Sequence, residues 1–244
     1  MLKNIMKSLI PVKYRKILSQ IKNTLTDGYA VKTYSQEGED VVLRRLFEWQ
    51  SNGFYVDIGA HHPMEFSNSY FFYKKGWRGI NIDPLPGIMR FFKIVRPKDI
   101  NLEIAISDKK ETLTYYAFET PSLNGFSQEI SERRSEQAGC KILFKKDIET
   151  QPLSEVLDRY LPEGQEIDFM SIDVEGLDFR VLQSNNWEKY SPKVILVESL
   201  TFDLENFGQN EIYNFLKPKG YRLFAKLYLN LIFKRDDFSG PPMC

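Results

Sequence analysis

The stretch Phe54-Tyr-Val-Asp57-Ile-Gly59-Ala60 decides the fold class of this 244-residue chain. Its apolar residues run continuously, which is typical of a strand buried on both faces of a parallel sheet. An acid lies at its end, followed by Gly59, whose missing Cβ lets the backbone turn tightly and approach a ligand. The stretch therefore predicts a buried parallel strand that ends in a nucleotide-cofactor turn.

Similar apolar runs recur along the chain and predict further strands at Gly79–Ile82, Leu102–Ile106, Ile167–Ile172 and Val194–Val197. Helices are expected from a cap at Ser35 through Phe47, at Asn68–Lys75 and at Gly176–Gln183. A closing hairpin is expected at Tyr221–Phe224 and Tyr228–Phe233. Strands that alternate with helices before a late hairpin predict an α/β fold, with a mostly parallel sheet and an antiparallel edge.

The sequence predicts two parts, residues 1–32 and residues 33–244. Residues 1–32 carry seven lysines and arginines against one acid, and Ile17, Leu18, Ile21 and Leu25 recur at helical spacing. Such a basic helical extension can lie on an anionic membrane surface, or it can dock on its own domain or on a second copy. Residues 33–244 are expected to form one domain, in which the polar stretch 120–147 is a lid or a mobile loop.

Composition limits the partners and the compartment. Lys plus Arg equals Asp plus Glu at 33 each, so nothing in the overall charge indicates a nucleic-acid partner. The two cysteines form no disulfide framework or zinc spacing, which fits a reducing cytoplasm. No apolar run is long enough to span a membrane. We expect a cytoplasmic protein, with contact at the inner face of the membrane through residues 1–32 as one reading; the oligomeric state is open.

Acids follow nearly every predicted strand, where ligands bind in an open parallel sheet. Asp83 lies 26 residues after Asp57, near the spacing at which dinucleotide folds place the acid that grips a ribose. The glycine pattern of a pyrophosphate-binding turn is absent, which argues against NAD or FAD. An adenosine ligand without a pyrophosphate remains, and S-adenosyl-L-methionine is the obvious one.

These motifs resemble the FkbM-type methyltransferases. The resemblance rests on Asp57-Ile-Gly-Ala, Ile82-Asp83-Pro84, Ile172-Asp173-Val-Glu175-Gly176, Val197-Glu198, Ser35-Gln36-x-Gly38-Glu39-Asp40 and Ser67-Asn68-Ser69-Tyr70, and it covers roughly residues 33–235. It implies the seven-stranded, Rossmann-like class I methyltransferase fold and O-methylation, often of sugars or secondary metabolites. It also implies that Gln36 reaches the cofactor. This chain departs from many relatives at His61-His62-Pro63, where they have Asn and Gly.

The resulting site hypothesis assigns a role to each strand end. The residues predicted to bind the cofactor are Gln36, Asp57, Gly59, His61, Asp83, Ala105 and Ser107, with Asp83 on the ribose and Ala105 to Ser107 beside adenine. The predicted catalytic residues are His62, Asp173 and Glu175, because imidazole and carboxylate groups can accept the proton of an acceptor hydroxyl. No resident metal is predicted, although Asp173, Glu175 and Glu198 have the hard oxygen ligands that a divalent cation takes.

The sequence thus favours an O-methyltransferase that acts on a small-molecule or glycan acceptor. A sugar hydroxyl in a bacterial surface polysaccharide or its precursor is the first choice, supported by the aromatic fraction of 14%. The alternatives are a small secondary metabolite as acceptor, or a non-catalytic domain of the same fold that binds a nucleotide or a partner.

Overall fold

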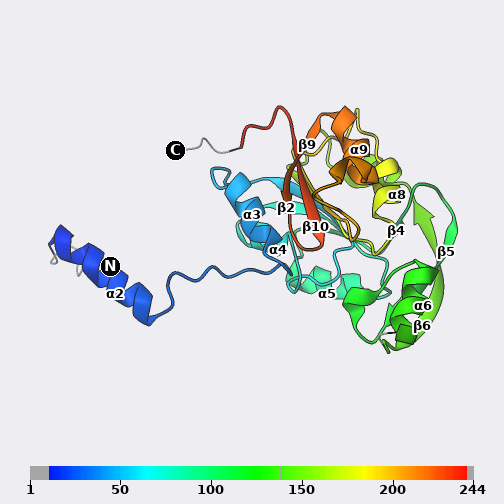
Figure 1. Cartoon of the computed structure of the whole chain (residues 1–244), viewed down its shortest axis with the longest axis horizontal. Coiled ribbons are helices and arrows are strands. Elements are labelled where there is room, and N and C mark those ends of the chain that lie inside the picture. Colours follow the sequence, from blue (N-terminus) through cyan, green and yellow to red (C-terminus); the bar gives the residue numbers. More distant parts are fainter. Residues whose placement is uncertain (1–10, 138, 241–244) are drawn as a thin grey trace. The chain divides into compact units, whose positions relative to one another are not determined.

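The computed structural model describes residues 11–137 and 139–240 (Figure 1). The chain forms two compact units, Met1–Thr33 and Tyr34–Cys244. In the first unit, helix α2 spans Val12–Leu25 and begins directly after Pro11, where a proline costs no helical hydrogen bond. None of the described helices is long and apolar enough to cross a membrane.

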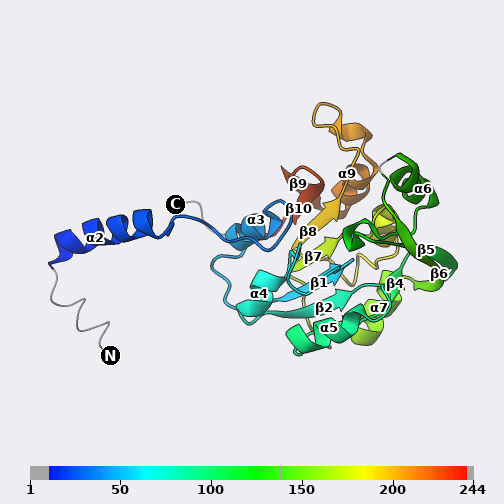
Figure 2. The same cartoon turned by 90° about the horizontal axis from the view of Figure 1, so that it is seen from below.

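The second unit is built on a seven-stranded sheet of order β3-β2-β1-β7-β8-β10-β9, which Figure 2 shows crossing the unit. Neighbouring strands are parallel from β3 to β8, and β10 is antiparallel to both β8 and β9. The predicted mostly parallel sheet with an antiparallel edge is therefore confirmed. Its strands are β1 Phe54–Ile58, β2 Arg78–Ile82, β3 Ile100–Leu102, β7 Phe169–Ile172, β8 Val194–Glu198, β9 Tyr221–Lys226 and β10 Asn230–Arg235.

The central strands have continuous apolar runs because each one packs into two separate cores. In β8, Ile195 and Val197 join one cluster, whereas Val194 and Leu196 join the cluster on the opposite face. Full burial of each such side chain stabilises the fold by about 1.5–3 kcal/mol. The helices of this unit are α3 Glu39–Leu46, α4 Tyr70–Lys74, α5 Ile88–Val95, α7 Leu153–Tyr160, α8 Asp178–Gln183 and α9 Glu211–Leu216, with short 3-10 turns η2 Phe207–Gln209 and η3 Lys217–Lys219.

The expected strand Leu102–Ile106 is wrong, because the chain changes sheets within it. Strand β3 ends at Leu102 in the main sheet, and β4, Ala105–Ile106, pairs with β6 in a second sheet of order β4-β6-β5. The two strands were read as one because Leu102, Ile104 and Ile106 are apolar and only Glu103 lies among them as a charged residue. The α3 helix also begins later than expected: Gly38 precedes its first residue, and the Ser35 hydroxyl accepts from the Asp40 amide.

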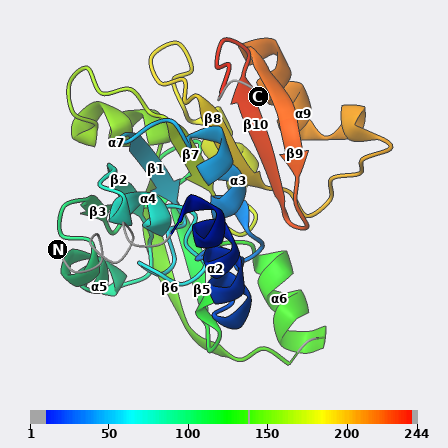
Figure 3. The ribbon, with the colours of Figure 1, turned by 90° about the vertical axis from the view of Figure 1, so that its left-hand side faces the viewer.

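The polar segment 120–147 is ordered in secondary structure. It contains the turn η1 Pro121–Leu123, helix α6 Gln128–Gln137 and the first part of β6 Ile142–Gln151, which pairs antiparallel with β5 Thr112–Phe118. Figures 1 and 3 both show α6 gathered with β5 and β6, on the opposite side of this unit from the β9–β10 hairpin. Its function as a lid stays a prediction.

Candidate active site

A cavity of about 260 Å³ opens at the carboxyl ends of the central strands. The strand register places these ends side by side, because Asp57 pairs with both Asn81 of β2 and Ser171 of β7. Of the residues predicted from sequence, those that line the cavity are Gln36, Asp57, Gly59, His61, Asp83, Asp173 and Glu175. The parallel sheet therefore brings together groups that lie up to 139 residues apart, from Gln36 to Glu175.

The turn after β1 requires glycine at position 59. Its φ is 80°, and a Cβ added there would lie 1.6 Å from the carbonyl oxygen of Asp173. The amides of Gly59 and Ala60 donate to the Ile82 carbonyl at 2.9 and 3.0 Å. This turn thus fixes β1 against the ends of both β2 and β7.

Asp83 is 7% exposed and accepts two backbone hydrogen bonds. The His61 amide donates to its Oδ2 and the Leu85 amide to its Oδ1, both at 2.9 Å. Burial raises the pKa of Asp83 to about 6, while the two amides act in the opposite direction. Each carboxylate oxygen has a second lone pair, so Asp83 retains acceptor capacity toward the cavity.

The two histidines have different surroundings. His61 lines the cavity with φ 51° and stacks on Phe66, with ring centroids 6.1 Å apart. His62 does not line it: its Nδ1 accepts from the Glu65 amide at 2.8 Å, and its ring packs edge-on to Phe91. Burial lowers the pKa of both imidazoles. The structure therefore places His62 in a local turn and His61 at the cavity.

The segment after β3 reaches the cavity through different side chains from those expected. Ile104 and Ile106 line it, whereas Ala105 and Ser107 do not. Side chains alternate along an extended segment, so Ala105 and Ser107 point the other way and are 1% and 0% exposed. A shift of one residue decides which face points to the cavity. The signal that could have shown it is the alternation of the large apolar Ile104 and Ile106 with small or polar neighbours along residues 103–107.

Asp57 belongs to a buried network of hydrogen bonds that no sequence motif indicated. Ser69 donates its hydroxyl hydrogen to Asp57, and the Arg96 guanidinium donates to Ser69 at 2.8 Å and to Asn81 at 2.9 Å. Burial raises the pKa of Asp57, and the positive charge of Arg96 offsets part of that rise. Arg96 is fully buried yet lies in no recognisable motif.

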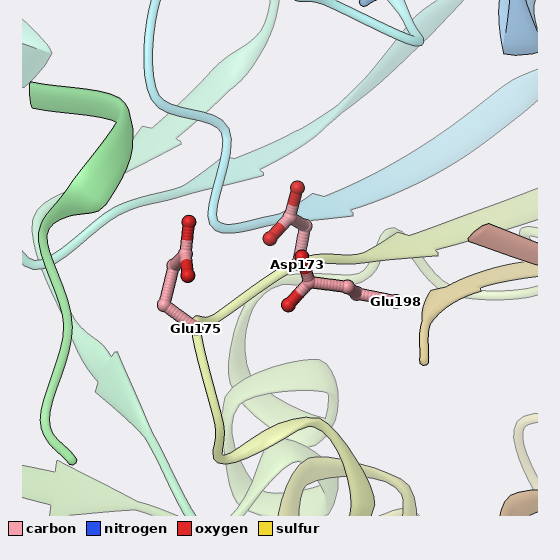
Figure 4. A group of neighbouring side chains, drawn as sticks. All are labelled: Asp173, Glu175 and Glu198. Carbon is pink, nitrogen blue, oxygen red and sulfur yellow. The ribbon is translucent and has the colours of Figure 1, made fainter. Parts of the chain in front are cut away.

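Three carboxyl groups meet beyond the ends of β7 and β8 (Figure 4). Each of Asp173, Glu175 and Glu198 offers an oxygen, and these atoms lie within 4.8 Å of one another. Burial and the neighbouring negative charges raise the pKa of Asp173 and of Glu198. The sequence grouped these three acids only as possible oxygen ligands of a cation, and the pairing of β7 with β8 brings their side chains together.

Glu175 also contacts the segment 120–147. Its Oε2 accepts from Arg134 of α6 at 2.6 Å, and Arg134 donates to the Leu123 carbonyl at 2.8 Å. Gly125 approaches so closely that a Cβ there would lie 2.9 Å from the Cβ of Glu175. The residues of this segment that line the cavity are Pro121–Phe126 and Arg134, together with Tyr115 of β5. Sequence analysis did not single out Arg134.

The open parallel sheet, the cavity at its carboxyl edge and the buried acid after β2 define an α/β protein that binds an adenosine-type cofactor. A family model described as the methyltransferase FkbM domain matches residues 57–223, so the chain belongs to that family. It is a methyltransferase, and its cofactor is S-adenosyl-L-methionine. The search of the curated proteins found no match.

Among solved structures, the chain is similar to a TehB-like SAM-dependent methyltransferase from Corynebacterium glutamicum. The two share 11% sequence identity with a TM-score of 0.39, over 92% of this chain and 100% of that chain.

The cavity residues fit this cofactor. Asp83 has acceptor capacity for the two hydroxyls of a ribose, and the nearby apolar wall of Leu85, Ile104 and Ile106 suits a purine ring. Gly59 lines the cavity, and its missing Cβ leaves room for the Asp173 carbonyl beside it.

Proposed function

We propose that the protein methylates a hydroxyl group of a sugar, in a bacterial surface polysaccharide or its precursor. The observation that carries the proposal is the pair Asp173 and Glu198, whose carboxyl groups face the cavity without a hydrogen bond or ion pair in the described part of the chain. A sugar hydroxyl holds its proton tightly, so transfer to its oxygen calls for a base within the cavity.

S-adenosyl-L-methionine, when bound, supplies an electrophilic methyl group: the bond from carbon to sulfur breaks with its electron pair left on sulfur, and the acceptor oxygen bonds to carbon. The acceptor's proton passes to a carboxylate of this chain, Asp173 or Glu198. Their raised pKa makes either one a stronger base than an exposed carboxylate. The partly buried pair of Arg134 and Glu175 covers the same space and reduces access of water.

Mass spectrometry of surface glycans tests the acceptor. Cells that contain the protein are expected to carry glycan sugars heavier by one methylene than cells that lack it. The difference should disappear with Asp173→Asn, whereas exchange of the exposed Glu163 for Gln should leave it intact. Methylation found only on a small secondary metabolite would contradict the glycan acceptor while leaving methyl transfer itself in place.

The first unit supports a second proposal, peripheral contact with an anionic membrane through α2. Five apolar side chains share one face of this helix and are exposed: Tyr14, Ile17, Leu18, Ile21 and Leu25. The helix also carries Lys13, Arg15, Lys16 and Lys22 and no acid. Each lysine or arginine near an anionic bilayer contributes roughly 1 kcal/mol to binding, in addition to burial of the apolar face.

Sedimentation with lipid vesicles tests this contact. The full chain is expected to sediment with phosphatidylglycerol vesicles, less with phosphatidylcholine vesicles, and less at high salt. Ile21→Asp should weaken this binding strongly, whereas Ser19→Asp makes the same change of charge on the polar face and should weaken it less. Equal loss in the two variants, or no binding by the wild type, would refute insertion of the apolar face.

A further inference from the structure

The carboxyl cluster formed by Asp173, Glu175 and Glu198 is crowded with like charge. Two of the acids follow β7 and the third ends β8, so neighbouring strands of the sheet hold all three at fixed positions. Their nearest oxygens lie within 4.8 Å, a distance at which one ion can contact them all. The arrangement does not depend on a flexible surface loop alone, because Asp173 and Glu198 directly continue or end buried strands.

The surroundings of Glu198 give a second observation, independent of the clustering, that points to a ligand. Its side chain is buried, with 7% of the residue exposed, and it faces the Asp173 carboxyl group in Figure 4. Among the residues that the structure describes, no donor forms a hydrogen bond with its carboxyl group and no cation forms an ion pair with it. A buried carboxylate without a partner carries a large desolvation cost, so native structures normally supply one.

The three acids of the cluster have fewer basic partners than negative charges. Arg134 is the one basic side chain that forms an ion pair with any of the three acids in the described chain, and it pairs with Glu175. When both are ionised, Asp173 and Glu198 carry two negative charges that no basic side chain of the described chain matches with an ion pair. Carboxylate oxygens are the ligands that Mg²⁺ and Mn²⁺ prefer, and these ions carry the two positive charges required.

We propose that Asp173, Glu175 and Glu198 bind one divalent cation, Mg²⁺ or Mn²⁺, on the acceptor side of the cavity. Glu175 has two oxygens, so it can contact the ion through one while Arg134 holds the other. Water or an acceptor oxygen completes the coordination, because these cations take six ligands. The acceptor hydroxyl is then bound beside the cluster, where a carboxylate oxygen that does not contact the ion accepts its proton. This reading rests on the proposed function.

Direct binding of Mn²⁺ to the full-length protein tests the inference. The electron paramagnetic resonance signal of free Mn²⁺ is expected to fall when the protein is added. Glu198→Gln keeps the shape of the side chain and removes its charge, and it should weaken Mn²⁺ binding at least about tenfold, since even groups behind metal ligands have effects of that size. Asp173→Asn should do the same.

Glu39→Gln is the matched control. Glu39 is also a buried acid that lines the cavity, but its Oε1 already accepts from Asn230 at 2.7 Å. Mn²⁺ binding should be unchanged in this variant. Thermal unfolding of each protein gives a second readout: Mn²⁺ should raise the midpoint of the wild type and of Glu39→Gln, but not that of Glu198→Gln.

Binding of S-adenosyl-L-methionine, measured on the same samples without Mn²⁺, separates the two proposals. Intact cofactor binding with no uptake of Mn²⁺ by the wild type would overturn the cation site and leave methyl transfer standing. Equal Mn²⁺ affinity in the wild type and Glu198→Gln would also overturn it. Specific Mn²⁺ binding without any methylated glycan would support the cation site and contradict the sugar acceptor instead.

Discussion

At the scale of single residues, backbone strain concentrates at the cavity. Four described residues other than glycine have positive φ, and three of them, His61, Phe66 and Glu175, line this cavity. Each such conformation costs about 1–3 kcal/mol and persists only where the surroundings enforce it. The amide of His61, for example, is held by Asp83. Strained backbone at the cavity is expected of a functional site, where the position of the side chains is kept at a cost to the stability of the fold.

Gly59→Ala is expected to destabilise the protein by more than about 2 kcal/mol, since the left-handed conformation alone costs an L-residue about 1–2 kcal/mol. The new Cβ would also clash with the Asp173 carbonyl oxygen, which should abolish cofactor binding. Urea unfolding and calorimetry measure the two effects. Gly208→Ala, where a Cβ meets open space, should leave both unchanged; a mild effect at Gly59 would contradict the role assigned to this turn.

Asp83 gives the site a dependence on pH. Burial raises its pKa to about 6, so the protonated form predominates below that pH and the acceptor form above it. Affinity for S-adenosyl-L-methionine should therefore rise between about pH 5 and pH 7 and then level off. In Asp83→Asn the affinity should be low and nearly independent of pH. Calorimetric titration at several pH values checks this, and a wild-type affinity that falls over this range would contradict it.

At the scale of elements, Arg134 fastens α6 to the site. It pairs with Glu175 and donates to the Leu123 carbonyl, and hydrogen bonds to charged groups contribute about 1.5–3 kcal/mol each. Arg134→Gln should accelerate amide hydrogen exchange in residues 121–134 by at least about tenfold, since about 1.4 kcal/mol suffices for that factor. It should also raise the KM for the acceptor.

Arg133→Gln is the control for that experiment, because Arg133 is an exposed neighbour on the same helix. It removes one positive charge from α6 without touching the pair. Equal exchange rates in the two variants would show that the Arg134–Glu175 contact does not hold this segment, and the lid interpretation would then lose its support.

At the scale of the whole molecule, the two units are expected to be energetically independent. Every residue of the three hydrophobic clusters belongs to the second unit, so residues 1–33 supply none of that core. Removal of residues 1–33 should therefore leave the urea midpoint and cofactor affinity unchanged while vesicle binding is lost. A lower midpoint in the truncated protein would show instead that α2 packs on the second unit.

Much of this architecture was readable from the sequence, because its signals are local. Strands buried on both faces need continuous apolar runs, and the turn after β1 needs a residue without a Cβ at Gly59. Both requirements act on neighbouring residues and so leave a pattern in the chain. The acid Asp83 is similar, since its place at the end of β2 follows from the strand itself.

Tertiary structure alone decided which groups meet. Arg134 reaches Glu175 across 41 positions, Asn81 and Ser69 bind a buried Arg96, and Glu198 joins Asp173 only because β8 pairs with β7. The choice of Ile104 and Ile106 over Ala105 and Ser107 depends on where the chain leaves one sheet for the other. Contacts between distant segments are set by packing of the whole chain, so no local pattern records them. The turn at Asp57-Ile-Gly59-Ala60 was determined by the sequence, whereas the carboxyl cluster that faces it was determined by the fold.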